Sequence, residues 1–98
     1  MTDQWLREER DGDRRSLFLV ELRVARGASG DLDRMQAALR HAVSRLGRSG
    51  VAIRWAGSVA LPGDARCLCV VEATDHAQVA LARDTAGLTA SIQPTEEN

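Results

Sequence analysis

Residues 16–25, SLFLVELRVA, decide the fold, because apolar side chains recur there with the two-residue period of a β-strand. One face of this predicted strand is wholly apolar and consists of Phe18, Val20, Leu22 and Val24. The opposite face begins with Leu17 and Leu19 and becomes charged at Glu21 and Arg23. A strand with apolar groups on both faces belongs in the middle of a sheet, where each face has something to pack against.

An amphipathic helix is predicted to follow this strand. Its apolar side chains recur at helical spacing and are Leu32, Met35, Leu39, Val43 and Leu46. Ser29 or Asp31 is expected to cap the N-terminal end of the helix, and Gly47 the C-terminal end. The single apolar stripe can cover one face of a sheet.

A β-hairpin is predicted next, because apolar residues alternate from Val51 to Leu61, turn residues follow at 62–64, and an apolar run occupies 66–73. Strict alternation assigns one face of the first hairpin strand to Val51, Ile53, Trp55 and Val59. It assigns the opposite face to Ala52, Arg54, Ala56, Ser58 and Ala60. Trp55 and Ser58 are therefore expected on opposite sides of the sheet.

A shorter helix and a last strand complete the pattern. Thr74 or Asp75 is expected to cap the helix, which ends near Ala86 before Gly87. Its packing face is expected to consist of Ala77, Ala80 and Leu81. Residues 88–93 are predicted to form the last strand, with Pro94 ending the ordered structure because proline cannot donate to a sheet.

The order β-α-β-β-α-β predicts an α+β, ferredoxin-like sandwich in which both helices cover one face of an antiparallel sheet. The second face would then expose Leu17 and Leu19. Because monomers rarely expose large apolar patches, we expect two chains to pack sheet against sheet as a homodimeric α/β barrel. The alternative is a monomer with an open, partly apolar sheet.

Length and composition limit the classes of protein that are possible. Ninety-eight residues, 44% of them hydrophobic, fit one domain, predicted at residues 16–93 between a charged arm at 1–15 and a polar tail at 94–98. A net charge of −1 does not favour a nucleic-acid partner, and the apolar stretches are too short for a membrane span or a signal peptide. We therefore predict a cytoplasmic protein, and the use of arginine in place of lysine suggests a bacterial one.

Short motifs occur in four of the predicted elements. They are FLVE at 18–21, Trp55 with Ser58, CVVEA at 69–73 with Asp75, and Ala82 with Gly87 and Leu88. With these motifs the chain resembles a family of small ferredoxin-like domains of unassigned function that includes nickel-responsive bacterial proteins. The resemblance implies a dimeric α/β barrel. Members often have a histidine where this chain has Gly57, so a metal role is not carried over at that position.

The charged end of the first strand offers candidate catalytic groups. If a barrel forms, Glu21 and Arg23 point into a cavity beside Leu19. A carboxylate desolvated there would have a raised pKa and could transfer a proton, while the guanidinium could hold an anionic oxygen. The alternative is an ion pair between the two charges at the sheet end or at the dimer seam.

Trp55 is the candidate aromatic wall of a ligand site, with Leu19 and Ser58 as further ligand contacts and open space beside Gly57. The alternative role of Trp55 is ordinary packing in the core or an interface. Similar dimeric barrels act as cofactor-free cyclases, isomerases or oxygenases in bacterial biosynthetic pathways. The leading hypothesis is thus a homodimer that binds a small, partly apolar molecule and uses no cofactor.

The alternative function is a metal-binding, nickel-type or metal-responsive protein without catalysis. It is motivated by the family resemblance and by His41, His76, Cys67 and Cys69. The C-x-C pair lacks the second ligand pair of zinc motifs, and neither histidine has a partner at helical spacing. No metal site is therefore predicted, and buried structural thiols are expected.

Overall fold

The computed structural model describes residues 15–25, 27–28 and 30–95. Apart from Arg15, the predicted N-terminal arm lies outside the described residues, as do the last three residues of the predicted tail. No helix in the described ranges is long and apolar enough to cross a lipid bilayer.

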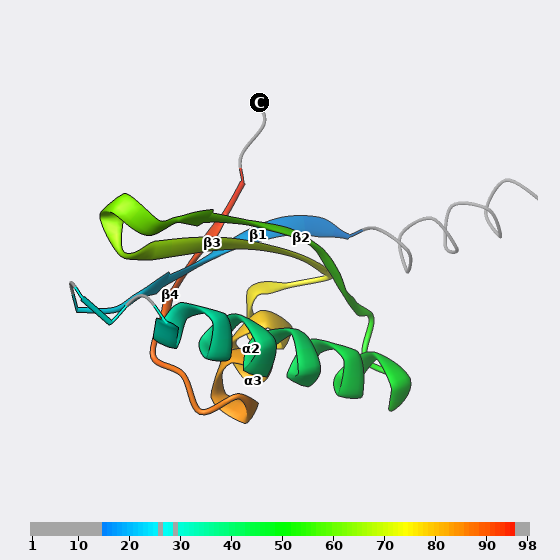
Figure 1. Cartoon of the computed structure of the whole chain (residues 1–98). Coiled ribbons are helices and arrows are strands. Elements are labelled where there is room, and N and C mark those ends of the chain that lie inside the picture. Colours follow the sequence, from blue (N-terminus) through cyan, green and yellow to red (C-terminus); the bar gives the residue numbers. More distant parts are fainter. Residues whose placement is uncertain (1–14, 26, 29, 96–98) are drawn as a thin grey trace, which may run out of the picture.

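Four strands and two helices follow the predicted order along the chain. The elements are β1 (Ser16–Arg23), α2 (Gly30–Arg48), β2 (Ile53–Leu61), the 3₁₀ turn η1 (Pro62–Asp64), β3 (Arg66–Ala73), α3 (His76–Thr85) and β4 (Ser91–Pro94). The strands form one antiparallel sheet in the order β2-β3-β1-β4, and both helices lie on the same side of it (Figure 1). The α+β class is confirmed, and the strand order is compatible with a ferredoxin-like fold.

The core fills the space between the sheet and the helices. The wholly apolar face of β1 lies there as predicted, and its register with β3 aligns Phe18 with Val71 and Val20 with Cys69. Leu39 and Val43 of α2 close this layer and are almost completely buried. Both cysteine side chains belong to this core, which confirms that they share one face.

The prediction that Gly47 caps α2 is wrong, because the helix continues to Arg48. The chain leaves the helix at Gly50, which has φ +106°, with the Val51 N–H donating to Leu46 O and the Gly50 N–H to Gly47 O. This is a Schellman ending, in which the glycine takes the left-handed position. Gly47 has another role, since a Cβ there would lie 3.2 Å from Ile53 O, so it allows α2 to approach β2 closely.

The ends of α3 agree with the prediction, but its packing face does not. Asp75 caps the helix by accepting from the Gln78 N–H at 3.0 Å, and Gly87 ends it with φ +74°. The core side of α3 is formed by Val79 and Ala82, whereas Leu81 is 46% exposed. Val79 belongs to the core cluster, so the side of α3 that faces the sheet is the one that bears Val79 and Ala82, and Leu81 faces outward.

A β-bulge in β2 overturns the predicted alternation. Trp55 pairs with Val71, but the next paired residue is Gly57, which faces Val70, so Ala56 is an extra residue. Val59 pairs with Leu68 and therefore lies on the side away from the helices, although Trp55 lies on the helix side. One inserted residue thus divides a set of side chains that simple alternation placed together.

The last strand begins later and ends later than predicted. It comprises Ser91–Pro94, and the Thr95 N–H and Oγ1 both donate to Leu17 O at 3.0 Å. Proline is tolerated at Pro94 because β4 is an edge strand, so one side of it needs no donor. The strand thus ends one residue beyond Gln93, near which the ordered structure was expected to stop.

Candidate functional site

The structure separates the predicted site residues into two groups. Leu19, Glu21 and Arg23 lie on the sheet face that no described helix covers, here called the open face. Trp55 lies on the opposite side of the sheet, next to α2. Ser58 pairs with Cys69, a core residue, so the bulge moves it to the side of Trp55, contrary to the prediction, and it is exposed there.

The centre of the open face is apolar. Its side chains come from three adjacent strands and are Leu17, Leu19, Val59, Leu61, Leu68 and Val70. Leu17 is 42% exposed and Val59 is 57% exposed, and the other four are partly buried by their neighbours. Since both helices lie on the other side, this predicted second apolar face is present and uncovered by the described chain.

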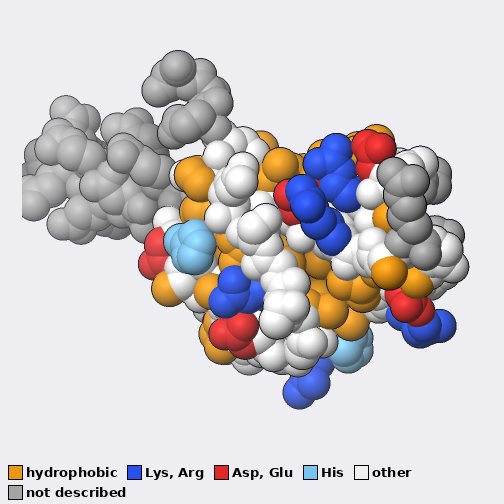
Figure 2. Space-filling model, turned by 90° about the vertical axis from the view of Figure 1, so that its left-hand side faces the viewer, with side chains coloured by type: hydrophobic (Ala, Val, Ile, Leu, Met, Phe, Trp, Pro, Cys, Tyr) orange, Lys and Arg blue, Asp and Glu red, His pale blue; other side chains and the backbone are white. Residues whose placement is uncertain are grey.

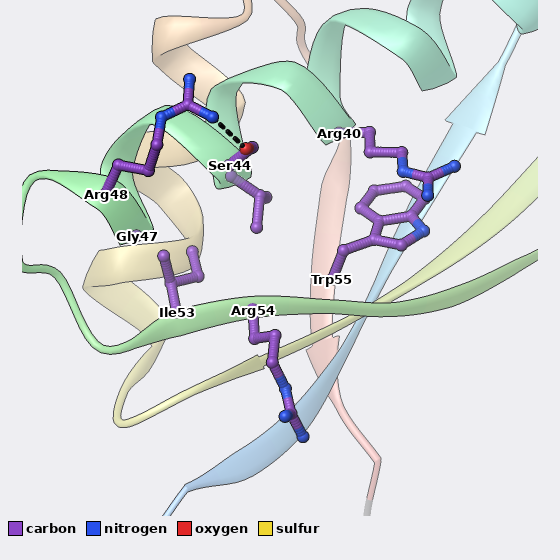
Figure 3. Close-up of a pocket in the computed structure, with 8 residues that line it drawn as sticks. Arg40, Ser44, Gly47, Arg48, Ile53, Arg54 and Trp55 are labelled. Carbon is purple, nitrogen blue, oxygen red and sulfur yellow. Dashed lines mark hydrogen bonds between the residues drawn. The ribbon is translucent and has the colours of Figure 1, made fainter.

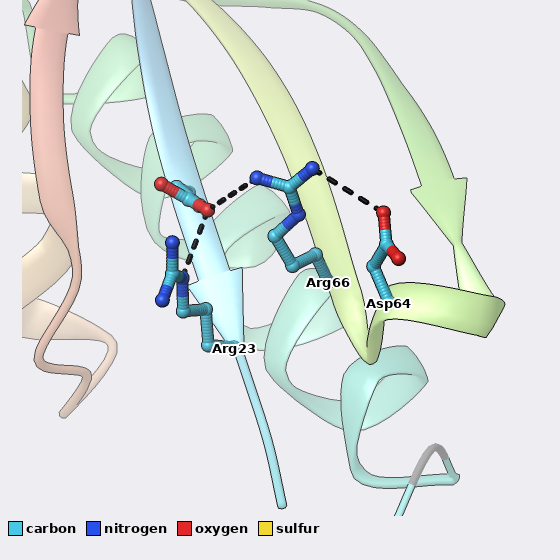
Figure 4. A network of polar contacts seen from close by, with 4 residues as sticks. Arg23, Asp64 and Arg66 are labelled. Carbon is cyan, nitrogen blue, oxygen red and sulfur yellow. Dashed lines mark hydrogen bonds and ion pairs between the residues drawn. The ribbon is translucent and has the colours of Figure 1, made fainter. Parts of the chain in front are cut away.

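A charged network closes one end of the open face (Figure 4). Glu21 Oε2 accepts from Arg23 Nε at 2.9 Å and from Arg66 Nη1 at 3.0 Å. Arg66 Nη2 also lies 3.4 Å from Asp64 Oδ2. The Glu21 side chain is 17% exposed and the Arg23 side chain 71%, so the carboxylate is held under the two guanidinium groups.

The ionisation of Glu21 differs from the sequence-based expectation. The hydrogen bond from Arg66 is the main cause, and the one from Arg23 the second, of a lowered pKa for this carboxyl. Burial acts in the other direction but is outweighed. In the single chain the pKa of Glu21 is thus lowered and the contacts match the ion-pair alternative, whereas the raised pKa was expected for a carboxylate desolvated inside a dimeric barrel.

Glu21→Gln is expected to weaken the pH dependence of stability in acid. Because the folded pKa is lowered, the ionised carboxyl stabilises the fold above its ordinary pKa of 4.5, and this contribution is lost as the pH falls through the folded value. Urea denaturation at a series of pH values from neutral to acid should give a flatter curve for the variant than for the parent.

Two arginine variants serve as comparisons for this measurement. Arg66→Gln should flatten the acid dependence more than Arg23→Gln, because Arg66 contributes the larger effect on the pKa of Glu21. If Glu21→Gln keeps the full acid dependence of the parent, the network does not hold the ionised carboxylate in solution.

A hollow of about 320 Å³ adjoins this network at the same end of the sheet. Its lining residues are Arg23, Val24, Asp64, Ala65 and Arg66. On the face drawn in Figure 2, basic and acidic side chains lie next to one another among hydrophobic ones, in keeping with charges that are paired. The open face thus combines an apolar centre with a polar hollow at its end.

A second charged cluster occupies another part of the open face. Glu72 Oε1 lies 2.9 Å from Arg54 Nη2 and 3.8 Å from Arg15 Nη1. Glu72 is the register partner of Leu17, whereas Glu21 lies four residues further along β1. The two acidic residues therefore belong to separate clusters at opposite ends of the apolar centre.

On the helix side, Trp55 lines a pocket between α2 and β2 that alternation did not predict. Arg40 Cζ lies 5.9 Å from the centre of the Trp55 ring, and Arg48 Nη1 donates to Ser44 Oγ at 3.0 Å (Figure 3). Sequence reasoning missed these α2 residues. A signal was available, because residues 34–48 contain four arginines and no acidic residue.

The thiols and imidazoles form no reactive centre in the described ranges. The sulfur atoms of Cys67 and Cys69 lie 3.9 Å apart as free thiols, and burial raises the pKa of Cys69 to about 12, which suppresses its thiolate. His41 and His76 are both exposed, the latter edge-on to Phe18. Among the described residues, no group of three or more histidine, cysteine and acidic side chains is placed to hold a metal ion.

Comparison with known proteins identifies no relative: no protein-family model, no curated protein and no solved structure matches the chain.

Proposed function

We propose that the protein acts as a homodimer that packs sheet against sheet and holds a small, partly apolar molecule over the open face. The observation that carries this proposal is the uncovered apolar centre of the sheet, where Leu17 and Val59 are 42% and 57% exposed. Contiguous apolar surface in water is typical of an interface. A second copy brings the same surface, so a two-fold arrangement covers both patches at once.

The charged network would supply the polar end of the binding site. The ligand's apolar body would lie on Leu19, Leu68 and Val70, and its polar group would face the hollow beside Arg23 and Arg66. Because the Glu21 carboxylate is already ionised and paired, its role in this proposal is to orient the two guanidinium groups. A cyclase, isomerase or oxygenase activity would need a different proton-transfer group from Glu21.

Leu17→Arg is expected to convert the dimer into a monomer. The new charge would have to lose its water inside an apolar interface, so the interface should fail. Light scattering coupled to a sizing column gives the mass directly. The parent should have a measured mass near twice that of one chain, and the variant should have a measured mass near that of one chain.

Leu81→Arg is the matched control, because Leu81 is 46% exposed, much like Leu17, but lies on α3, away from the open face. This variant should remain dimeric. A parent that elutes as a monomer at all concentrations, or a control that dissociates as readily as Leu17→Arg, would remove the proposed interface.

A further inference from the structure

The pocket between α2 and β2 has the size and the lining of a small-molecule site. Its volume is about 350 Å³, within the range in which pockets bind small ligands. Val43, Ile53 and Gly47 form an apolar floor, because the glycine brings the helix close to the strand there. The half-buried Trp55 forms one wall.

The rim of this pocket is basic. Arg40, Ser44 and Arg48 lie at intervals of four residues along α2, so they follow one side of the helix above the floor. Arg54 also lines the pocket, but its side chain points to the other side of β2 and pairs with Glu72 (Figure 3). None of the described residues that line the pocket is acidic.

Arg40 and Arg48 differ from most other described arginines in having no acidic partner. Six arginines of the described chain form ion pairs with carboxylates, namely Arg15, Arg23, Arg34, Arg54, Arg66 and Arg83. Within the described ranges, Arg40 contacts only the indole face of Trp55, and Arg48 only the Ser44 hydroxyl. Their positive charges are thus available to an incoming anion.

We infer that this pocket binds a small aromatic acid, with the ring on the apolar floor beside Trp55 and the anionic group between Arg40 and Arg48. A planar guanidinium matches the geometry of a carboxylate or a phosphate and can donate two parallel hydrogen bonds to it. The cation–π contact, with Arg40 Cζ 5.9 Å from the centre of the ring, favours a position of one guanidinium over the indole before the ligand arrives, which lowers the entropy lost on binding. The Ser44 hydroxyl adds a further donor.

This site is independent of the homodimer proposed above. Trp55 and the arginine rim lie on the helix side of the sheet, whereas the proposed interface lies on the open face. Substitutions at Arg40 or Arg48 should therefore leave the protein dimeric in solution. The Leu17→Arg substitution should leave the pocket intact.

The test is a titration of the full chain with benzoate, phenyl phosphate and the neutral analogue benzamide, followed by ligand-observed saturation-transfer NMR. One or both anions should bind, and benzamide should bind at least about tenfold more weakly, because it lacks the charge that the guanidinium groups recognise. The stronger of the two anions identifies the acid as a carboxylate or a phosphate. Quenching of Trp55 fluorescence in a Trp5→Phe background gives an independent readout.

Substitutions locate the site. Arg40→Gln and Arg48→Gln should each weaken anion binding about tenfold, since each removes charge-assisted hydrogen bonds. Arg45→Gln is the matched control, because Arg45 is another exposed α2 arginine without an ion pair to a described residue, but it does not line the pocket. The affinity of the Arg45→Gln variant for the anions should stay within about twofold of that of the parent.

Three results would overturn the inference. They are equal binding of benzamide and the anions, equal weakening by Arg45→Gln and Arg40→Gln, and no binding of either anion throughout a titration into the millimolar range. The first shows that charge is not recognised, the second shows a diffuse attraction to a basic helix, and the third shows that the pocket is not an anion site.

Discussion

Leu39→Ala is expected to lower the free energy of unfolding by about 2–5 kcal/mol, the range for removal of a fully buried leucine. Leu39 lies in the middle of α2 with no exposed surface and belongs to the cluster that joins the helix to the sheet. Its loss leaves a cavity that the surrounding side chains can fill only in part. Since small domains are stable by only about 5–15 kcal/mol, urea denaturation should show a large shift of the midpoint.

Two further variants distinguish a cavity from a general effect of substitution. Leu39→Met preserves most of the volume and should cost less than about 1.5 kcal/mol. Leu81→Ala removes the same atoms from a side chain that is 46% exposed, so it should cost much less than Leu39→Ala. Similar losses for Leu39→Ala and Leu81→Ala would show that α2 does not pack against the sheet as described.

Much of the fold could be predicted because its signals are local. The alternation in β1 and the helical period of α2 each require only about ten neighbouring residues, and both identify the buried face correctly. The capping groups Asp75 and Gly87 are equally local. The end of α2 was harder, because Gly47 and Gly50 both suit a helix terminus and only the packing of Gly47 against Ile53 distinguishes them.

The candidate sites could be predicted only in part, because they depend on which strands lie side by side. The pairing of Glu21 with Arg23 follows from the sequence. The stronger partner of Glu21 is Arg66, which is 45 residues away and reaches Glu21 through the β1–β3 register. The pocket at Trp55 likewise needs the contact between α2 and an edge strand. Neither contact is visible within a single element, although the run of α2 arginines without an acidic residue can be seen in the sequence.

The bulge in β2 accounts for the largest error in the predicted site. Alternation placed Trp55 and Ser58 on opposite faces and Trp55 and Val59 on the same face, and both assignments are reversed by one extra residue at Ala56. Ala56 is a small, exposed residue that carries no bulge signal itself, although Gly57 beside it is of the type that often marks a bulge inside a strand. Only the register with β3 shows which residue is the extra one.

Deletion of Val70 is expected to abolish cooperative folding, whereas deletion of Ala56 should change the free energy of unfolding by about 1 kcal/mol or less. Val70 is a paired residue in the middle of β3, so its loss reverses the faces of one half of the strand and directs either Leu68 or Glu72 toward the core. Burial of an unpaired carboxylate or loss of the core face is more than a small domain can sustain.

Deletion of Ala56 should have a smaller effect than deletion of Val70, because the pairing of β2 with β3 is already regular on both sides of Ala56. Without it, Trp55 and Gly57 would still face Val71 and Val70, so every side chain would keep its face and only the local kink would be lost. Urea denaturation followed by Trp55 fluorescence in a Trp5→Phe background compares the two deletions, since the indole reports on the helix side of the sheet. If both deletions unfold the chain, or if both leave it folded, Ala56 is not the extra residue and the division between the open face and the Trp55 pocket must be redrawn.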